Sequence, residues 1–200
     1  MAEPIDFYFD FSSPYGYIAS ERIDEVAARH GREVRWRPFL LGAVFKLVGT
    51  APLLEYPLKG DYARRDMQRA ARQFGVPFCI PDGFPTSSLA ACRAYYWLED
   101  AAPALAKPFA HAVYRRYFAD NQPIEPAAPI VAILDSLGMD KVAAEAALQD
   151  PAVKAKLKAE VDAGIARGVF GSPFIFVDGE PFWGSDRLDQ IERWLETGGW

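Results

Sequence analysis

Residues 5–15 read IDFYFDFSSPY and combine a strand pattern with a helix start. The first five of them are aromatic or β-branched around one aspartate, and this length suits a buried strand. Ser13 offers a side-chain acceptor for a helix N-cap, and Pro14 has the fixed φ angle of a first helical residue. The sequence therefore predicts a strand that leads directly into a helix over residues 15–30.

The residues that follow complete a strand–helix–strand unit. Over residues 33–38, Val34 and Trp36 alternate with charged residues, as in a half-buried strand. Such a βαβ unit is almost always right-handed when its two strands share a sheet. The first 38 residues therefore predict a small parallel sheet with one crossover helix.

The middle of the chain, residues 42–167, contains no convincing strand pattern. We expect helices around residues 44–48, 59–74, 87–98, 104–118, 127–137, 140–149 and 151–167, with a Pro- and Gly-rich loop at 75–86. A hairpin follows, with strands at 174–177 and 181–183 joined by the turn Asp178-Gly179. Residues 184–186 then open a last helix.

This order of elements is similar to the thioredoxin fold with a helical insertion. We expect an α/β protein in which residues 1–41 and 168–200 form a thioredoxin-like domain and residues 42–167 an inserted helical domain. In the thioredoxin fold the first helix begins with the reactive group, and a proline, usually cis, faces it from before the third strand. Ser13 and Pro173 hold these two positions.

Composition restricts the function further. Half of the 200 residues are hydrophobic, and the net charge of −5 favours neither nucleic acid nor a membrane surface as partner. No apolar stretch approaches the roughly 20 residues of a membrane span. Residues 1–4 lack the features of a signal peptide, so we expect a cytoplasmic protein. Cys79 and Cys92 form neither a metal pattern nor a Cys-x-x-Cys pair, and with Ser13 at the reactive position dithiol exchange is excluded there.

Six segments, in chain order, resemble the 2-hydroxychromene-2-carboxylate isomerases and their relatives, the kappa-class glutathione transferases. They are residues 6–15 (DFYFDFSSPY), 45–52 (FKLVGTAP), 57–62 (PLKGDY), 84–93 (FPTSSLAACR), 168–174 (GVFGSPF) and 182–188 (FWGSDRL). Each segment is weak alone, but the ordered set covers nearly the whole chain.

The resemblance implies that glutathione lies along the thioredoxin-like half. Ser13 would hold its sulfur as a thiolate, which the N–H groups of a helix N-terminus also favour. Ser172 and Pro173 would pair with the backbone of its cysteine. Lys59 would meet its glycyl carboxylate, although a lone lysine on a charged helix is more often solvated.

The same resemblance implies further contacts. Gly184, Ser185 and Asp186 would hold the γ-glutamyl end, with helix amides on its carboxylate and Asp186 on its ammonium group. Lys46 and Thr50 would face the substrate. Thr50 and Ser185 stand where the family often has Asn, so a hydroxyl replaces an amide at both positions.

The implied reaction is the glutathione-dependent interconversion of 2-hydroxychromene-2-carboxylate and trans-o-hydroxybenzylidenepyruvate, a step in bacterial breakdown of naphthalene-like aromatics. The family also implies a homodimer, a small aromatic carboxylate as substrate and no metal. Two alternatives stay open: a kappa-like transferase, which would consume glutathione, and a non-catalytic glutathione-binding protein. In a purely structural interpretation, Ser13 and Asp186 are helix N-caps without a role in ligand binding.

Overall fold

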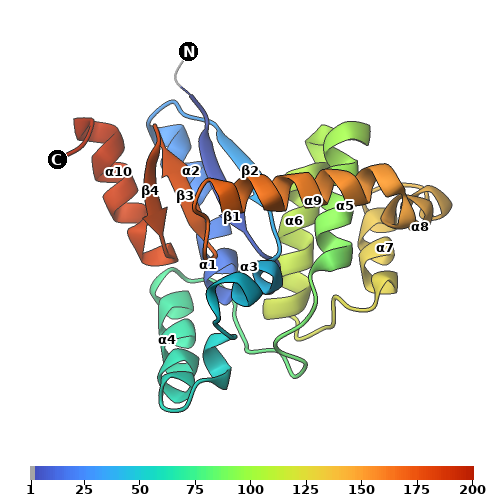
Figure 1. Cartoon of the computed structure of the whole chain (residues 1–200), viewed down its shortest axis with the longest axis horizontal. Coiled ribbons are helices and arrows are strands. Elements are labelled where there is room, and N and C mark those ends of the chain that lie inside the picture. Colours follow the sequence, from blue (N-terminus) through green and yellow to red (C-terminus); the bar gives the residue numbers. More distant parts are fainter. Residues whose placement is uncertain (1–2) are drawn as a thin grey trace.

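The computed structural model describes residues 3–200, and one four-stranded sheet organises them (Figure 1). The strands lie in the order β2-β1-β3-β4. β1 (Ile5–Phe9) runs parallel to β2 (Val34–Pro38) and antiparallel to β3 (Phe174–Val177), which pairs in turn with β4 (Glu180–Trp183). The predicted βαβ and hairpin units are confirmed, and they form a single mixed sheet of the thioredoxin type.

The helix predicted over residues 15–30 is two helices, α1 (Pro14–Ser20) and α2 (Ile23–Arg29). They separate at Arg22, whose φ of −130° is not helical. The Arg22 guanidinium lies 3.9 Å from the centre of the Phe74 ring, a contact 52 residues away in sequence. A tertiary contact therefore accompanies a break that the helical periodicity of this stretch did not predict.

Seven α-helices and one short 3₁₀ helix stand between β2 and β3 in the described chain. They are α3 (Leu41–Val48), the 3₁₀ helix η1 (Leu53–Glu55), α4 (Lys59–Gln73), α5 (Leu89–Ala101), α6 (Pro103–Phe118), α7 (Ala127–Ser136), α8 (Lys141–Gln149) and α9 (Pro151–Ala166). In Figure 1, α5 to α8 form a bundle beside the sheet, α3 and α4 lie below it, and α9 crosses in front. After β4 come the 3₁₀ helix η2 (Ser185–Arg187) and α10 (Leu188–Thr197).

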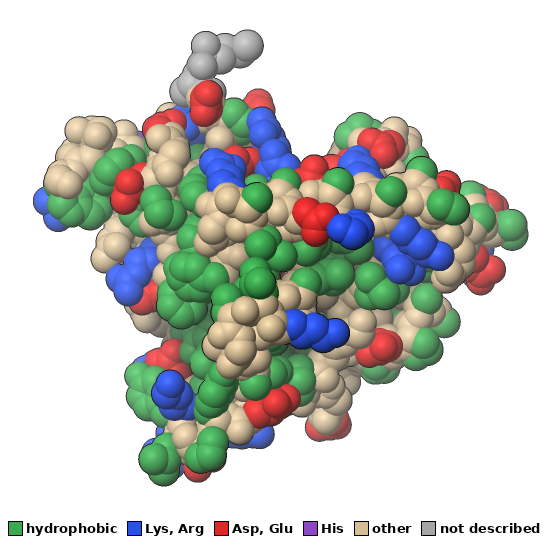
Figure 2. All heavy atoms as spheres, in the orientation of Figure 1, with side chains coloured by type: hydrophobic (Ala, Val, Ile, Leu, Met, Phe, Trp, Pro, Cys, Tyr) green, Lys and Arg blue, Asp and Glu red, His purple; other side chains and the backbone are tan. Residues whose placement is uncertain are grey.

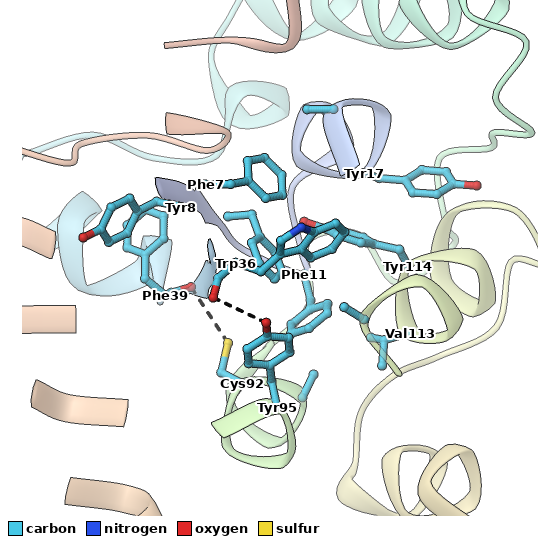
Figure 3. Packing of buried hydrophobic residues seen from close by; sticks show 14 of the residues in the cluster. Phe7, Tyr8, Phe11, Tyr17, Trp36, Phe39, Cys92, Tyr95, Val113 and Tyr114 are labelled. Carbon is cyan, nitrogen blue, oxygen red and sulfur yellow. Dashed lines mark hydrogen bonds between the residues drawn. The ribbon is translucent and has the colours of Figure 1, made fainter. Parts of the chain in front are cut away.

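A continuous aromatic core joins the sheet to the bundle. Phe9 of β1 packs against Trp36 of β2 and against Tyr95 and Tyr114 of α5 and α6, with ring centres 5.3 to 6.1 Å apart. Figure 3 shows Trp36, Tyr95 and Tyr114 in this core, with the Tyr95 hydroxyl donating to the backbone oxygen of Trp36. Because this one core crosses the boundary at residue 42, the division into two domains stays a prediction.

An ion pair joins the end of α9 to the sheet. Asp6 of β1 is 8% exposed and accepts hydrogen bonds from Arg37 of β2 and from Arg167, which directly follows α9. Burial alone would raise the pKa of Asp6, but the two arginines outweigh it and lower the pKa below the ordinary 3.8. None of the helices within residues 3–200 is long and apolar enough to cross a membrane.

Candidate active site

A cavity of about 730 Å³ lies between the end of the sheet at which α1 begins and the helices α3 and α4. Its walls come from the start of α1, the loop before β3, the β4–α10 connection and the segment from α3 to α4. Figure 2 shows hydrophobic side chains gathered on this face, beside α3. Phe45, Val48, Phe84 and Phe170 are among the lining residues. Its volume is in the range of small-molecule sites, which are typically ~300–1,000 Å³.

Ser13 lies in this cavity, 4% exposed, at the N-cap of α1. Its Oγ accepts from the Gly16 amide at 3.0 Å and donates to the backbone oxygen of Ser172 at 2.9 Å. The N-cap prediction is confirmed. A side chain at position 16 would bring a Cβ to 2.7 Å from the Tyr114 hydroxyl, so glycine allows the close approach of α1 and α6.

The loop before β3 lies directly beside Ser13 at the cavity. The Ser172–Pro173 peptide bond is cis, and the Pro173 oxygen accepts from the Gly184 amide at 3.1 Å. Gly171 lies directly under the Trp183 indole, because a Cβ there would come within van der Waals overlap of the indole nitrogen. Ser172 therefore lies at the cavity in a loop that is held by the Gly184 hydrogen bond on one side and by packing against Trp183 on the other.

Several backbone amides in the cavity wall carry no hydrogen bond to any residue that the structure describes. Two of them lie next to the Ser13 hydroxyl, namely those of Tyr15, in the first turn of α1, and of Ser172. Free N–H groups of this kind, together with the Ser13 hydroxyl, favour an anion or an extended peptide backbone. α1 itself is only seven residues long, so these local donors rather than a long helix dipole decide the preference.

Asp10 lies behind this loop and is 2% exposed. Its Oδ1 accepts from the Ser12 amide and hydroxyl, both at 2.8 Å, and its Oδ2 accepts from the Leu41 amide at 2.7 Å. Its own amide donates to Ser172 Oγ at 2.9 Å, and its backbone oxygen accepts from Tyr114. Burial raises the pKa of Asp10, and the three bonds to its carboxylate oppose that rise.

The segment predicted to hold the γ-glutamyl end of glutathione also lines the cavity, with Gly184, Ser185 and Asp186 adjacent. Ser185 is buried, whereas the Asp186 side chain is exposed and lies 3.3 Å from Arg187. Asp186 does not act as an N-cap, because η2 intervenes and α10 begins only at Leu188 without a side-chain cap. Its carboxylate pairs with Arg187 and is exposed at the cavity, where a ligand can reach it.

The remaining predicted residues are not all at the cavity. Thr50 and Lys59 line it, and the Lys59 ammonium group lies 5.5 Å from the centre of the Tyr56 ring. Lys46 is exposed on α3 and is not among the lining residues, so its predicted contact with substrate is not one that this arrangement makes. Four of the eight residues of α3 are exposed, including Lys46 and its neighbours Leu47 and Val48.

The sequence did not predict a hydrogen-bonded pair in the cavity wall, formed by Tyr15 and Asp66. The Tyr15 hydroxyl donates to Asp66 Oδ2 at 2.6 Å, and Arg69 pairs with the same carboxylate. Burial and this hydrogen bond raise the pKa of Tyr15, so the phenol keeps its proton and acts as donor. Tyr15 stands only two residues after Ser13, and that closeness was the one signal available in the sequence.

Neither cysteine belongs to the site. Cys92 is fully buried in the core beside Phe39 (Figure 3), and its burial raises the pKa of the thiol. Cys79 is half-buried and is not part of the cavity lining. A thiolate at this site would therefore have to come from a ligand.

Comparison with known proteins agrees with this geometry. The family model of the DSBA-like thioredoxin domain matches residues 4–196. A 2-hydroxychromene-2-carboxylate isomerase of Pseudomonas putida is 31% identical over 94% of this chain and 92% of its own. A solved structure of a 2-hydroxychromene-2-carboxylate isomerase superposes with a TM-score of 0.86 at 29% identity, covering 96% of this chain and 94% of that one. Glutathione S-transferase kappa 2 of Caenorhabditis elegans is 28% identical over 96% of this chain and 91% of its own.

The chain belongs to the family of DSBA-like thioredoxin domains and, within it, to the 2-hydroxychromene-2-carboxylate isomerases. The predicted fold and the predicted family resemblance are thereby confirmed.

Proposed function

We propose that this protein is a glutathione-dependent isomerase that converts 2-hydroxychromene-2-carboxylate, or a close analogue, into trans-o-hydroxybenzylidenepyruvate. The observation that carries the proposal is the convergence of Ser13, Ser172 and the pair Ser185-Asp186 on one cavity. Membership in the isomerase family supports the reaction, and the relatives named kappa-class transferases support glutathione as the thiol. The same relationship supports a role in the breakdown of aromatic compounds.

The residues at the cavity fit glutathione in charge and in hydrogen-bonding capacity. The ligand is an extended peptide with two carboxylates, one ammonium group and one thiol. Asp186 suits the ammonium group, Lys59 suits one carboxylate, and the unpaired Ser172 amide suits a peptide carbonyl. When bound, glutathione would supply a thiolate that adds to the conjugated carbon of the opened substrate, allows bond rotation, and leaves again unchanged.

The chain's own contribution is to stabilise negative charge on sulfur and to exclude water. The Ser13 hydroxyl, which donates to Ser172 in this structure, would turn toward the sulfur and donate to it instead. The Tyr15 amide offers a second donor nearby. One donor of this kind is typically worth ~3 kcal/mol where charge develops. The apolar wall around Phe45 and Phe84 would hold the aromatic ring of the substrate out of water.

The test is an ultraviolet assay of the purified protein with 2-hydroxychromene-2-carboxylate, with and without glutathione. The isomerase predicts conversion that requires glutathione while its total concentration stays constant. Consumption of glutathione would instead favour a kappa-like transferase. Glutathione binding without turnover of any such substrate would favour a non-catalytic binding protein.

We further propose that the protein acts in the cytoplasm as a homodimer, as the resemblance implies. A reducing compartment suits a site that depends on free glutathione, and both cysteines are unpaired. Sedimentation of the purified chain distinguishes a dimer of about 45 kDa from the 22.3 kDa monomer.

A further inference from the structure

One wall of the cavity is a single segment, residues 41–73, which comprises α3, η1 and α4. We call it the wall segment. In Figure 1 its last helix, α4, lies apart from the bundle of α5 to α8, below the sheet. It contributes Phe45, Thr50, Lys59 and Met67 to the lining, so its position sets the width of the cavity.

The wall segment has few polar ties to the remainder of the molecule. Within residues 3–200, two side-chain hydrogen bonds cross from it to the rest, and no ion pair does. One runs from the Leu41 amide to Asp10 Oδ2 at 2.7 Å, and the other from the Tyr15 hydroxyl to Asp66 Oδ2 at 2.6 Å. Backbone hydrogen bonds continue the chain at both ends of the segment, such as that from the Val76 amide to the Ala71 oxygen, and Val44 and Ala71 pack in the hydrophobic core.

Both ties start beside Ser13 in the chain. Asp10 precedes the serine by three residues and Tyr15 follows it by two. Asp10 holds the first residue of α3, whereas Tyr15 holds the middle of α4. Residues 10–15, which include Ser13, therefore form hydrogen bonds with both α3 and α4 of the wall segment.

We propose that Asp10 and Tyr15 are positioning residues that hold the wall segment over Ser13 and so set the shape of the substrate pocket. Each oxygen of Asp10 serves one side, Oδ1 the Ser12 turn and Oδ2 the wall. Tyr15 reaches Asp66, whose other oxygen is occupied by Arg69 of the same helix. The substrate part of this proposal rests on the proposed isomerase reaction; the structural part does not.

The test removes one hydroxyl at a time. Tyr15→Phe deletes the tie to α4 and leaves Ser13 and its partners in place. Tyr62→Phe is the matched control, because its hydroxyl lies 3.5 Å from the same Asp66 carboxylate but belongs to α4 itself, and Tyr62 is not a lining residue. Deuterium exchange of residues 59–73 is measured by mass spectrometry in both variants and in the unaltered protein.

We expect exchange in α4 to rise roughly tenfold in Tyr15→Phe and to stay unchanged in Tyr62→Phe, because only the first loses a hydrogen bond to a charged group across the segment boundary. In a protein that already carries Asp66→Ala, adding Tyr15→Phe should produce no further rise, since Asp66→Ala has already removed the acceptor of the Tyr15 hydroxyl. With 2-hydroxychromene-2-carboxylate, KM should increase several-fold while kcat and the thiolate absorbance of bound glutathione change little.

Equal exchange in the Tyr15 and Tyr62 variants would overturn the proposal. A rise spread evenly over β1, α5 and α6 would also overturn it, because that result indicates general destabilisation. If the unaltered protein fails to turn over the chromene, the isomerase reaction fails, and the exchange data still decide the role of Tyr15.

As a second variant, Asp10→Ala removes both carboxylate oxygens, including the acceptor of the Leu41 amide. If it folds, we expect faster exchange at the start of α3. Exchange there equal to that of the unaltered protein would remove Asp10 from the proposal.

Discussion

Replacing Ser13 with alanine should separate the structural role of this residue from its catalytic one. The hydroxyl makes two buried hydrogen bonds, from the Gly16 amide and to the Ser172 oxygen. Loss of an N-cap costs about 1 kcal/mol, and the second bond, whose carbonyl partner stays buried, costs about 1 kcal/mol more. A destabilisation of about 2 kcal/mol leaves a domain of ordinary stability folded.

The same substitution should lower the turnover of the enzyme much more than its folding stability. Removal of one donor to a developing anion typically lowers turnover roughly a hundredfold or more. Ser20→Ala is a suitable control, because Ser20 is also a buried serine of α1, with its hydroxyl donating to the Tyr17 oxygen at 2.7 Å, and it is not a cavity residue. It should lose about 1 kcal/mol and keep its turnover.

Both variants are compared by urea unfolding and by the ultraviolet isomerisation assay at saturating glutathione. The absorbance of bound thiolate near 240 nm is followed in parallel, and it should fall only in Ser13→Ala. Equal turnover in the two variants, corrected for the folded fraction, would refute the assignment of Ser13 as thiolate donor. Ser13 would then be a helix cap only.

Three further predictions concern other parts of the molecule. Lys59→Ala should raise KM for glutathione several-fold, whereas Lys46→Ala should not, and the isomerase assay at varied glutathione compares them. Gly171→Ala should cost ~1–3 kcal/mol in urea unfolding and alter tryptophan fluorescence, because the added methyl displaces the Trp183 indole. Asp6→Asn should flatten the loss of stability in acid: the lowered pKa of Asp6 stabilises the fold above pH 3.8, and that contribution disappears as the pH falls below it. Urea midpoints between about pH 2.5 and 6 measure this effect.

Short-range patterns predicted where the elements at the site begin, although not the break between α1 and α2. Ser13-Pro14 encodes a helix cap within four residues, and Asp178-Gly179 encodes a hairpin turn between two apolar runs. These features depend on local dihedral preferences and on neighbouring hydrogen bonds, which the order of residues specifies directly. The order of elements and the ordered family segments then led to the thioredoxin-type fold and to Ser13 opposite Pro173.

Tertiary packing alone decided how the cavity is closed. The Tyr15–Asp66 and Asp10–Leu41 bonds join residues 51 and 31 positions apart, and no local pattern predicts such pairs. The outward orientation of Lys46 likewise follows from how α3 packs on the core, not from its own sequence. A folded chain brings distant segments together through burial of apolar surface, and only then do their polar groups find partners.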